Sequence, residues 1–503
     1  MALALVPLVA RAAVPNTLPL HSDSPPLGPK PPPIGHKVRP VAGPTALAAR
    51  LSAIVHGAGL RGSQLGISVV RLDTGANLFA LGPERPLVPA SNVKLVTTLA
   101  ALDALSPDFQ FVTEVFGAHD GAGVVQGDLT IKGYGDPYLT PERVASLATR
   151  LKMLGIDRVA GRLRIDDGFF DVNDRLANGW QEDRSSRAYM APLGALSVGF
   201  NAVMVHVLPS RAPGAPAQIR IEPDQRYLRQ VDGLIGTVDG LPSRTRVEVV
   251  GRTLAVSGYV ARDLGPHAYW RRIEDPPAFA GEVFKRALAA ADVQVDGEAI
   301  AGAADAGTPL LASATSPRLG ELVVPLNKFS NNFMAGQVAL ALGAARFGAP
   351  ATWNKAHRAL EDFLGERVGI AKGSYQLGNA SGLHSVNHMR ASQLVKLLAF
   401  ARRQPRYNVE FENALPTAGG IGTLADRLHQ PHTSFVIRAK TGTLQKASSL
   451  SGYVSTRDGV PLAFSLLCND YRHIEDIWAA QDLFAATLAG ATLGERAGPS
   501  ASP

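Results

Sequence analysis

Cysteine is almost absent from this chain of 503 residues, which contains only Cys468. A single cysteine cannot form an internal disulfide, and because it lies in an apolar strand pattern we expect it to be buried and unreactive. Its position far from the N-terminus argues against a lipid-anchored cysteine. No apolar run approaches the roughly 20 residues that a membrane-spanning helix needs, so we expect no integral membrane span.

Patterns that bind metals or nucleotides are missing as well. His384 and His388 are four residues apart, but no Glu follows His384 as the metalloprotease pattern requires. His429 and His432 lie close together without a further ligand pattern, so we expect no metal site. Gly133-Tyr134-Gly135 does not continue into a helix-opening glycine pattern, and we therefore expect no nucleotide or other cofactor.

Basic residues exceed acidic ones, which gives a formal charge of +7 at pH 7 and a pI of about 9.5. They do not cluster in a run with aromatic residues, so we expect no nucleic-acid partner. The excess charge fits a basic soluble protein, and it also fits attraction to an anionic cell-envelope polymer or membrane surface.

Three short polar motifs are present in a fixed order and far apart in the sequence. They are Ser91-Asn92-Val93-Lys94, Ser330-Asn331-Asn332 and Lys440-Thr441-Gly442. Each motif alone carries a high risk of chance occurrence. Their order and their contexts together point to a serine acyl-transferase whose base is a lysine rather than a histidine.

Ser91 and Lys94 are three residues apart at the start of a strongly apolar pattern that predicts a buried helix. Residues with this spacing lie on one helix face, with about 5–6 Å between Cβ atoms, so Lys94 can reach the Ser91 hydroxyl. A lysine beside an apolar core is partly desolvated, which lowers its pKa and lets it accept a proton. The alternative is an exposed N-cap serine followed by a solvated lysine.

Ser330 and Asn332 lie between an apolar segment that ends near Pro325 and a second helical pattern. The Ser330 hydroxyl could pass a proton between Lys94 and a leaving amine. Asn332 could donate a hydrogen bond to a substrate carbonyl. Ordinary helix capping by Ser and Asn is the alternative.

Lys440-Thr441-Gly442-Thr443 begins a strand pattern that two further strand patterns follow. We predict that Lys440 lies on an edge strand facing the site, and that the Thr441 and Thr443 hydroxyls point the same way as each other. Gly442 removes a side chain where an extended peptide would lie against the strand. The alternative is an edge strand that its lysine protects from aggregation.

Together these motifs resemble the active site of the penicillin-binding proteins and serine β-lactamases. The long separation of Ser91 from Ser330 narrows the resemblance to the class C low-molecular-weight penicillin-binding proteins, the D-Ala-D-Ala carboxypeptidase/endopeptidase family. Three further stretches are similar to that family: Gly127–Pro137, Gly194–Asn201 and Leu415–Leu424. The similarity runs from about residue 46 to about residue 490.

One stretch and one single position depart from the family pattern. The family usually has Asp-Gly-Ser-Gly-Leu-Ser-Arg where this chain has Asn379-Ala380-Ser381-Gly382-Leu383-His384-Ser385. Because the arginine is missing, the way in which the family recognises an acidic stem-peptide side chain cannot be assigned to this chain. Gly336 stands where the family often has Glu. None of the motif residues is affected, so we expect the catalytic machinery to be complete.

The resemblance implies a serine D-Ala-D-Ala carboxypeptidase/endopeptidase that acts on peptidoglycan stem peptides through an acyl-enzyme and is acylated by penicillin. Its expected partners are therefore peptidoglycan peptides and β-lactams. The implied catalytic residues are Ser91 as nucleophile, Lys94 as base, and Ser330 and Lys440 as the groups that return the proton to the leaving amine. The implied substrate-binding residues are Asn332, Thr441, Gly442 and Thr443.

Two alternative functions use the same motifs. One is a β-lactamase on the same site, against which the large insertion between Ser91 and Ser330 argues. The other is a non-catalytic wall-binding scaffold that keeps the fold, against which the intact motifs argue.

The length of the chain and its 46% hydrophobic content allow two or three domains with sizeable cores. We predict an α/β fold: a serine β-lactamase/transpeptidase-like catalytic domain, an antiparallel sheet plus helices, formed by residues 46–106 and 311–490. Short strand patterns separated by Pro and Gly predict a large, mostly β insertion at 107–310. An inner module is expected near 206–262.

The first 45 residues and the last 13 fall outside these predicted domains. Apolar residues 2–10 followed by Ala10-Arg11-Ala12 look like the end of a signal peptide without its basic start. Pro-rich residues 14–45 predict an extended linker, and residues 491–503 predict a disordered tail. These features predict a periplasmic or otherwise exported protein, with a frayed tail of chance composition as the alternative.

Overall fold

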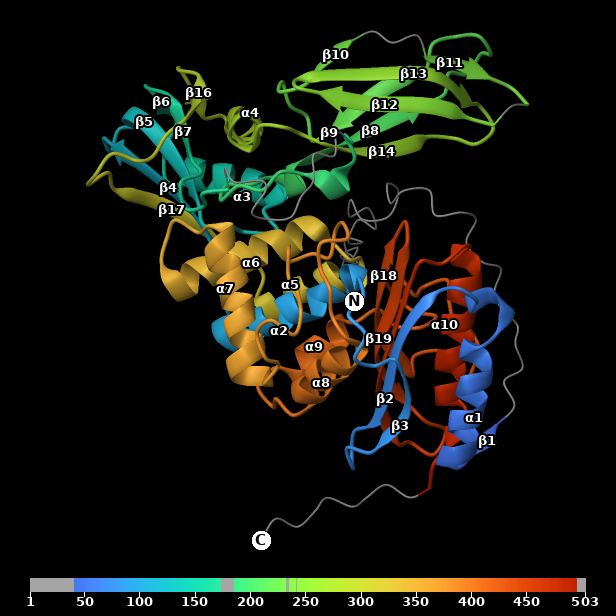
Figure 1. Ribbon diagram of the computed structural model, residues 1–503. Coiled ribbons are helices and arrows are strands. Elements are labelled where there is room, and N and C mark those ends of the chain that lie inside the picture. The colour runs from blue at the N-terminus through green and yellow to red at the C-terminus, as the bar shows by residue number, and fades with distance from the viewer. Residues whose placement is uncertain (1–39, 173–184, 232–234, 241, 495–503) are drawn as a thin grey trace, which may run out of the picture.

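A computed structural model describes residues 40–172, 185–231, 235–240 and 242–494 (Figure 1). The predicted signal-like segment, most of the predicted linker and residues 495–503 of the predicted tail lie outside these ranges. The two ends of the described chain meet, because β1 (Val41–Ala42) pairs in parallel with β21 (Ala491–Thr492). Within these ranges, no helix has both the length and the apolar character needed to cross a membrane.

A five-stranded antiparallel sheet in the order β18-β19-β20-β2-β3 is built from both ends of the chain. Its strands are β2 (Gln64–Arg71), β3 (Asn77–Leu81), β18 (Ile437–Leu444), β19 (Ala447–Ser455) and β20 (Pro461–Asn469). Helices α1 (Pro44–Val55) and α10 (Ile474–Ala489) pack together on one face (Figure 1). The edge position of β18, predicted for the strand of Lys440, is confirmed.

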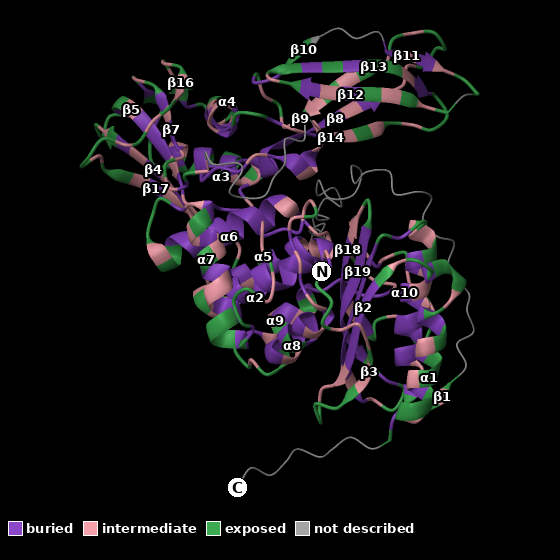
Figure 2. Ribbon diagram, viewed as in Figure 1, coloured by how far each residue is buried: buried purple, intermediate pink, exposed green. Residues whose placement is uncertain are grey.

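A group of helices covers the other face of this sheet (Figure 1). Its members are α2 (Val93–Leu105), α5 (Leu319–Lys328), α6 (Asn332–Phe347), α7 (Trp353–Asp362), α8 (Ala391–Arg402) and α9 (Asn408–Ala414). A π-helical turn, Phe363–Val368, follows α7. Every residue of α2 from Val93 to Leu102 is buried (Figure 2). A helix that is apolar on all sides is expected to lie inside the protein, and the predicted buried helix is confirmed.

Between α2 and α5 the chain forms a second region with a separate core. A seven-stranded mixed sheet, ordered β15-β6-β5-β4-β17 with β7 and β16 alongside, packs against α3 (Pro141–Met153) and α4 (Pro276–Ala290). The strands are β4 (Val112–His119), β5 (Val124–Gly133), β6 (Arg158–Val159), β7 (Leu163–Asp166), β15 (Gln294–Val295), β16 (Ala299–Ala301) and β17 (Leu310–Thr315).

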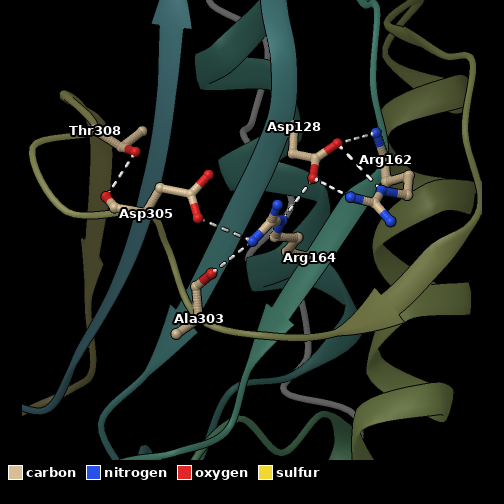
Figure 3. Close-up of polar contacts among 6 residues, drawn as sticks. All are labelled: Asp128, Arg162, Arg164, Ala303, Asp305 and Thr308. Atoms are coloured by element: carbon tan, nitrogen blue, oxygen red, sulfur yellow. Dashed lines mark hydrogen bonds and ion pairs between the residues drawn. The ribbon is translucent and has the colours of Figure 1, made fainter.

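One polar cluster joins three segments of this region (Figure 3). Asp128 accepts hydrogen bonds from the Arg162 backbone N–H at 2.7 Å and from Arg164 Nε at 2.5 Å. Arg164 Nη1 also contacts Asp305 Oδ1 at 3.2 Å, in the loop before β17. Burial raises the pKa of Asp128, but the hydrogen bonds from the two arginines outweigh it and lower this pKa to about 2. The cluster therefore holds the loop before β17 against β5 and β7.

A third region consists of two small sheets that extend from the second. One sheet has the order β14-β8-β9, and the other has the order β10-β13-β11 with β12 paired to β13. The strands are β8 (Ala202–Leu208), β9 (Gln218–Glu222), β10 (Arg229–Val231), β11 (Ile235–Val238), β12 (Arg244–Val250), β13 (Thr253–Ala261) and β14 (His267–Arg272). Ala202 and Arg272 are Cα partners, so this module leaves and rejoins the second region at one place.

The predicted domain boundaries remain predictions. The strand β17 crosses the boundary placed at 310/311 and pairs with β4 of the second region. The inner module predicted near 206–262 falls inside the two small sheets, which begin at Ala202 and end at Arg272. Short strands that pair with distant partners make such boundaries hard to place from sequence patterns.

Candidate active site

Ser91 lies where the five-stranded sheet meets the helical layer. It is the middle residue of a 3-10 turn, Ala90–Asn92, that leads directly into α2. Ala90 has a positive φ of 47°, and Gly382 packs so closely that a Cβ there would lie 1.9 Å from Ala90 O. A left-handed conformation costs free energy in a non-glycine residue and often occurs at functional sites. The turn leaves Ser91 half-buried at the start of a helix that is buried from Val93 to Leu102.

The Lys94 amine contacts three oxygens. Its Nζ lies 3.1 Å from Ser91 Oγ, 2.7 Å from Asn332 Oδ1 and 2.6 Å from Ser381 O. A neutral amine has two N–H donors and one lone pair. The two shorter contacts use both hydrogens, which leaves the lone pair for the hydrogen of the Ser91 hydroxyl. This is the geometry that a general base requires.

The site contains two buried lysines, because the side chains of both Lys94 and Lys440 are 0% exposed. Burial lowers the pKa of Lys94 well below its usual value, and the charge of Lys440 lowers it further. Burial also lowers the pKa of Lys440 to about 7. In the part of the chain that the structure describes, neither lysine has a carboxylate partner. Two amines shifted towards neutrality in this way are a feature of catalytic sites.

The strand β18 brings Lys440 to the Ser91 turn, and Lys440 Nζ donates to Thr441 O at 2.8 Å. At Gly442 a Cβ would lie 2.8 Å from Ser91 N and 2.3 Å from Ser449 Oγ. The sequence pattern predicts that an extended substrate peptide lies against the strand at this glycine. In the structure the space is already occupied by the Ser91 turn and by β19, so Gly442 is needed for the site to assemble.

Asn92, which is not among the predicted site residues, connects the turn to the sheet. Its Nδ2 donates to Lys440 O at 3.2 Å and to Ser449 Oγ at 2.6 Å. Ser449 Oγ in turn donates to Pro89 O at 2.7 Å. Asn92 is fully buried, and these contacts hold Ser91 and Lys440 in a fixed relation.

Ser330 and Asn332 lie at the turn between α5 and α6. Ser330 has a positive φ of 60°, and its hydroxyl makes no hydrogen bond to Lys94 or Lys440 among the described residues. Asn332 Oδ1 accepts from Lys94, whereas its amide nitrogen lies 3.4 Å from Tyr189 O. Of the Asn332 side chain, only the amide nitrogen is a donor, and it is the atom that could donate a hydrogen bond to a substrate carbonyl. The proton-transfer role of Ser330 and the substrate contact of Asn332 stay predictions.

The segment Leu415–Leu424 lies along one side of the site. Thr441 Oγ1 donates to Thr423 Oγ1 at 2.6 Å. The Thr423 N–H donates to Lys328 O at 2.9 Å, and Lys328 Nζ donates to Leu415 O at 2.9 Å. The end of α5 therefore holds this segment beside β18. Its similarity to the family was the only sequence signal, and it did not single out Thr423 or Lys328.

The segment that departs from the family pattern, residues 379–385, contacts the Lys94 amine. Ser381 supplies a backbone carbonyl to the Lys94 amine, and Asn379 Oδ1 accepts from the N–H groups of Ser381 at 3.1 Å and Gly382 at 2.7 Å. The amide oxygen of Asn379 thus provides the acceptor that a carboxylate oxygen would provide. The second departure, Gly336, faces Leu193, where a Cβ would lie 2.5 Å from Leu193 Cδ1.

The structure connects six of the eight predicted site residues by direct contact or close packing. Lys94 contacts Ser91 and Asn332, Lys440 contacts Thr441, and Gly442 packs on the Ser91 turn. Thr443 is half-buried on β18, next to Gly442. Ser330 directly precedes the Asn331–Asn332 start of α6.

A family model matches most of the chain. The model is described as the D-Ala-D-Ala carboxypeptidase 3 (S13) family, and it matches residues 47–488. A D-alanyl-D-alanine carboxypeptidase of Actinomadura sp. is 34% identical over 465 residues, which cover 88% of this chain and 85% of that protein. The D-alanyl-D-alanine carboxypeptidase DacB of Haemophilus influenzae is 26% identical over 392 residues, 76% of this chain and 81% of that protein.

Solved structures show the same fold. The crystal structure of penicillin binding protein 4 from Haemophilus influenzae matches with a TM-score of 0.75 and 24% identity, over 87% of this chain and 98% of that chain. The same protein complexed with a β-lactam matches with a TM-score of 0.71 and 23% identity, over the same shares of both chains. The predicted fold class, a transpeptidase-like α/β domain with a large insertion, is confirmed.

Proposed function

Because this chain belongs to the D-Ala-D-Ala carboxypeptidase 3 (S13) family, we propose that Ser91 is the nucleophile of a serine D-Ala-D-Ala carboxypeptidase and that Lys94 is its base. One observation carries the assignment of these two residues. The Lys94 amine uses two contacts, to Asn332 Oδ1 and Ser381 O, in a way that directs its lone pair at Ser91 Oγ. Burial lowers the pKa of this amine, so the amine is neutral over a wider pH range than the amine of a free lysine is.

The proposed reaction begins with attack of Ser91 Oγ on the carbonyl of the penultimate D-Ala, while its proton passes to Lys94 Nζ. The backbone N–H groups of Ser91 and Thr443 stabilise the oxyanion, and each such donor is worth about 3 kcal/mol of barrier in serine hydrolases. Asn332 orients the acyl part of the substrate. Water then releases the acyl group from Ser91.

The leaving group is the terminal D-Ala. We propose that Lys440, Thr441 and Thr443 bind its carboxylate, and that Ser330 and Lys440 return the proton to its amine. The pKa of Lys440 near 7 suits a group that both binds an anion and exchanges a proton at neutral pH. A β-lactam follows the same acylation step, but its leaving group stays attached and blocks the entry of water.

The same site also suits the cross-links between stem peptides, so endopeptidase activity is part of the proposal. Both activities place the substrate in the cell wall, which makes peptidoglycan peptides and β-lactams the proposed partners. An exported, for example periplasmic, location follows from that substrate and agrees with the signal-like residues 2–12 of the sequence.

Two assays on the wild-type protein test this function. A pentapeptide that ends in D-Ala-D-Ala should release D-Ala, and labelled penicillin should form one stable adduct per chain. Nitrocefin should give a single burst of hydrolysis. Sustained turnover of nitrocefin without release of D-Ala would instead support the β-lactamase alternative, and the absence of any penicillin adduct would support a non-catalytic scaffold.

We further propose that the two small sheets between Ala202 and Arg272 select polymeric substrate. Residues 203–271 carry none of the catalytic motifs, and replacing them by a short Gly-Ser linker joins two residues that are already Cα partners. The deleted form is expected to keep penicillin acylation, because the site comes from flanking segments. It should lose activity on intact sacculi more than activity on the pentapeptide.

The deletion needs a control for correct folding, because the module packs against α4. Tyr227 packs against Phe279 of α4 at a ring-centroid distance of 5.7 Å, so the deletion exposes an apolar face of α4. Penicillin acylation at the wild-type rate establishes that the remaining protein is folded around Ser91. Equal losses on sacculi and on pentapeptide would show that the module supports the rest of the protein instead of selecting polymer.

A further inference from the structure

Two large apolar side chains are exposed beside the site. Ile421 is 63% exposed and Phe435 is 65% exposed. The Phe435 ring lies against Gly420, whose Cβ, if present, would be 3.3 Å from Phe435 Cε1. We call Gly420, Ile421 and Phe435 the apolar rim. A single exposed apolar residue is ordinary, but adjacent ones next to a substrate site suggest a contact surface.

The backbone holds Phe435 in this exposed position at a cost. Its φ is +65°, a conformation that is rare in bulky residues. The Phe435 N–H donates to Ala418 O at 3.0 Å, and the Ala418 N–H donates to Ile437 O at 3.0 Å. Because the Phe435 ring is exposed to solvent, its packing in a core cannot compensate for the strain of this backbone conformation. Strain of this kind is often retained where it serves function.

The free edge of β18 is divided into a covered part and an open part. Segment 416–418 covers the part at Arg438 and Ala439. Thr417 forms an isolated β-bridge with Arg438, and the Ala439 N–H donates to Pro416 O at 2.9 Å. From Lys440 onward no backbone group of the described residues pairs with this edge, which leaves that part open to a peptide. The hydrogen bond from Thr441 to Thr423 marks the limit between the two parts. Ile421 O accepts from the Thr417 N–H at 3.4 Å, so Ile421, like Phe435, lies on the covered side of this limit and two residues from Thr423.

The geometry points to the apolar rim as a subsite on the leaving-group side of the scissile bond, and this inference rests on the proposed function. A carboxylate held at Thr441 marks the end of a D-Ala leaving group, so that substrate does not extend to the rim. In a cross-linked peptide the leaving amine belongs to a diamino acid. Its carboxylate can take the same place, and its methylene chain then continues beyond Thr441 towards Ile421 and Phe435.

The chemistry of the step is the same for both leaving groups. The amide C–N bond breaks as the bond between Ser91 Oγ and the acyl carbon forms, the amine leaves with the proton, and water later releases the acyl group. The difference lies in binding, because a methylene chain gains free energy when apolar side chains remove it from water. The rim would therefore favour cross-link cleavage over release of free D-Ala.

The test compares two substrates: a purified cross-linked dimer of two stem peptides and the uncross-linked pentapeptide ending in D-Ala-D-Ala. The variants are Ile421→Ser and Phe435→Asn, since Asn tolerates a positive φ. Val409→Ser on α9 is the matched control, because Val409 is 61% exposed and belongs to neither segment of the rim. The ratio of kcat/KM for dimer to kcat/KM for pentapeptide is the readout.

Each rim variant is expected to lower this ratio by about tenfold, mainly through KM for the dimer, as loss of an apolar contact does in substrate discrimination. Val409→Ser should leave the ratio unchanged. An unchanged ratio in the rim variants, or a wild-type protein that cannot cleave the dimer, overturns the inference while D-Ala release and penicillin labelling still support the proposed function. A wild-type protein that shows none of these activities overturns both.

Discussion

Ser91→Ala is expected to abolish penicillin labelling and to lower release of D-Ala by about 10⁴-fold or more, because it removes the oxygen that forms the acyl-enzyme in the proposed reaction. The adduct is measured on a gel with labelled penicillin and located by mass spectrometry on the peptide that contains Ser91. The change removes one half-buried hydroxyl and leaves the turn of Ala90–Asn92 in place. The free energy of unfolding should therefore change by no more than about 0.5 kcal/mol.

Ser385→Ala is the matched control for this experiment. Ser385 is exposed and lies in the same loop as Ser381, but it belongs to none of the three motifs. This variant should label like the wild type. An adduct found on another serine, for example Ser330, would show that the nucleophile has been assigned to the wrong residue.

The local part of this site could be predicted because local rules determine it. The helical period places residues three apart on one face, and the resulting distance between Lys94 Nζ and Ser91 Oγ is 3.1 Å. The apolar residues after Lys94 predict a buried helix, and that burial lowers the pKa of the lysine. The edge position of Lys440 follows in the same way from the run of strand patterns that continues after it.

The contacts that complete the site could not be predicted. The Lys94 amine depends on Ser381 O, a backbone carbonyl that any residue type could supply. Asn92 reaches Ser449 across the interface between the helical layer and the sheet. Such contacts join segments that only tertiary packing brings together, and nothing in the sequence near either partner marks them.

Gly442 shows what a local pattern can indicate about a site and what it cannot. The strand pattern and the motif indicated that a side chain had to be absent. A Cβ at this position would lie 2.8 Å from Ser91 N, and Ser91 is 351 residues earlier in the chain. The need for a glycine can be predicted from a local pattern, whereas the atoms that impose it follow only from the fold.

Lys94→Arg is expected to slow acylation by penicillin by about 10²-fold or more. A guanidinium stays protonated and cannot accept the Ser91 proton, and general-base catalysis contributes about 10²–10⁴-fold. Lys396→Arg on α8 is the control, because Lys396 Nζ also donates to a backbone carbonyl, Gly369 O, at 2.6 Å. That variant should react at the wild-type rate. Near-normal acylation of Lys94→Arg would show that another group takes the proton.

The dependence of acylation on pH should report the Lys94 amine directly. Only the neutral amine has a lone pair, so the rate should rise with pH through an apparent pKa well below the usual lysine value of 10.5. Burial lowers this pKa, and the charge of Lys440 lowers it further. Lys440→Met removes the charge and keeps the burial, so the rising limb should move to higher pH even though the maximal rate falls. Stopped-flow acylation with a chromogenic β-lactam measures both profiles, and a limb that stays in place or moves to lower pH would show that Lys440 does not tune the base.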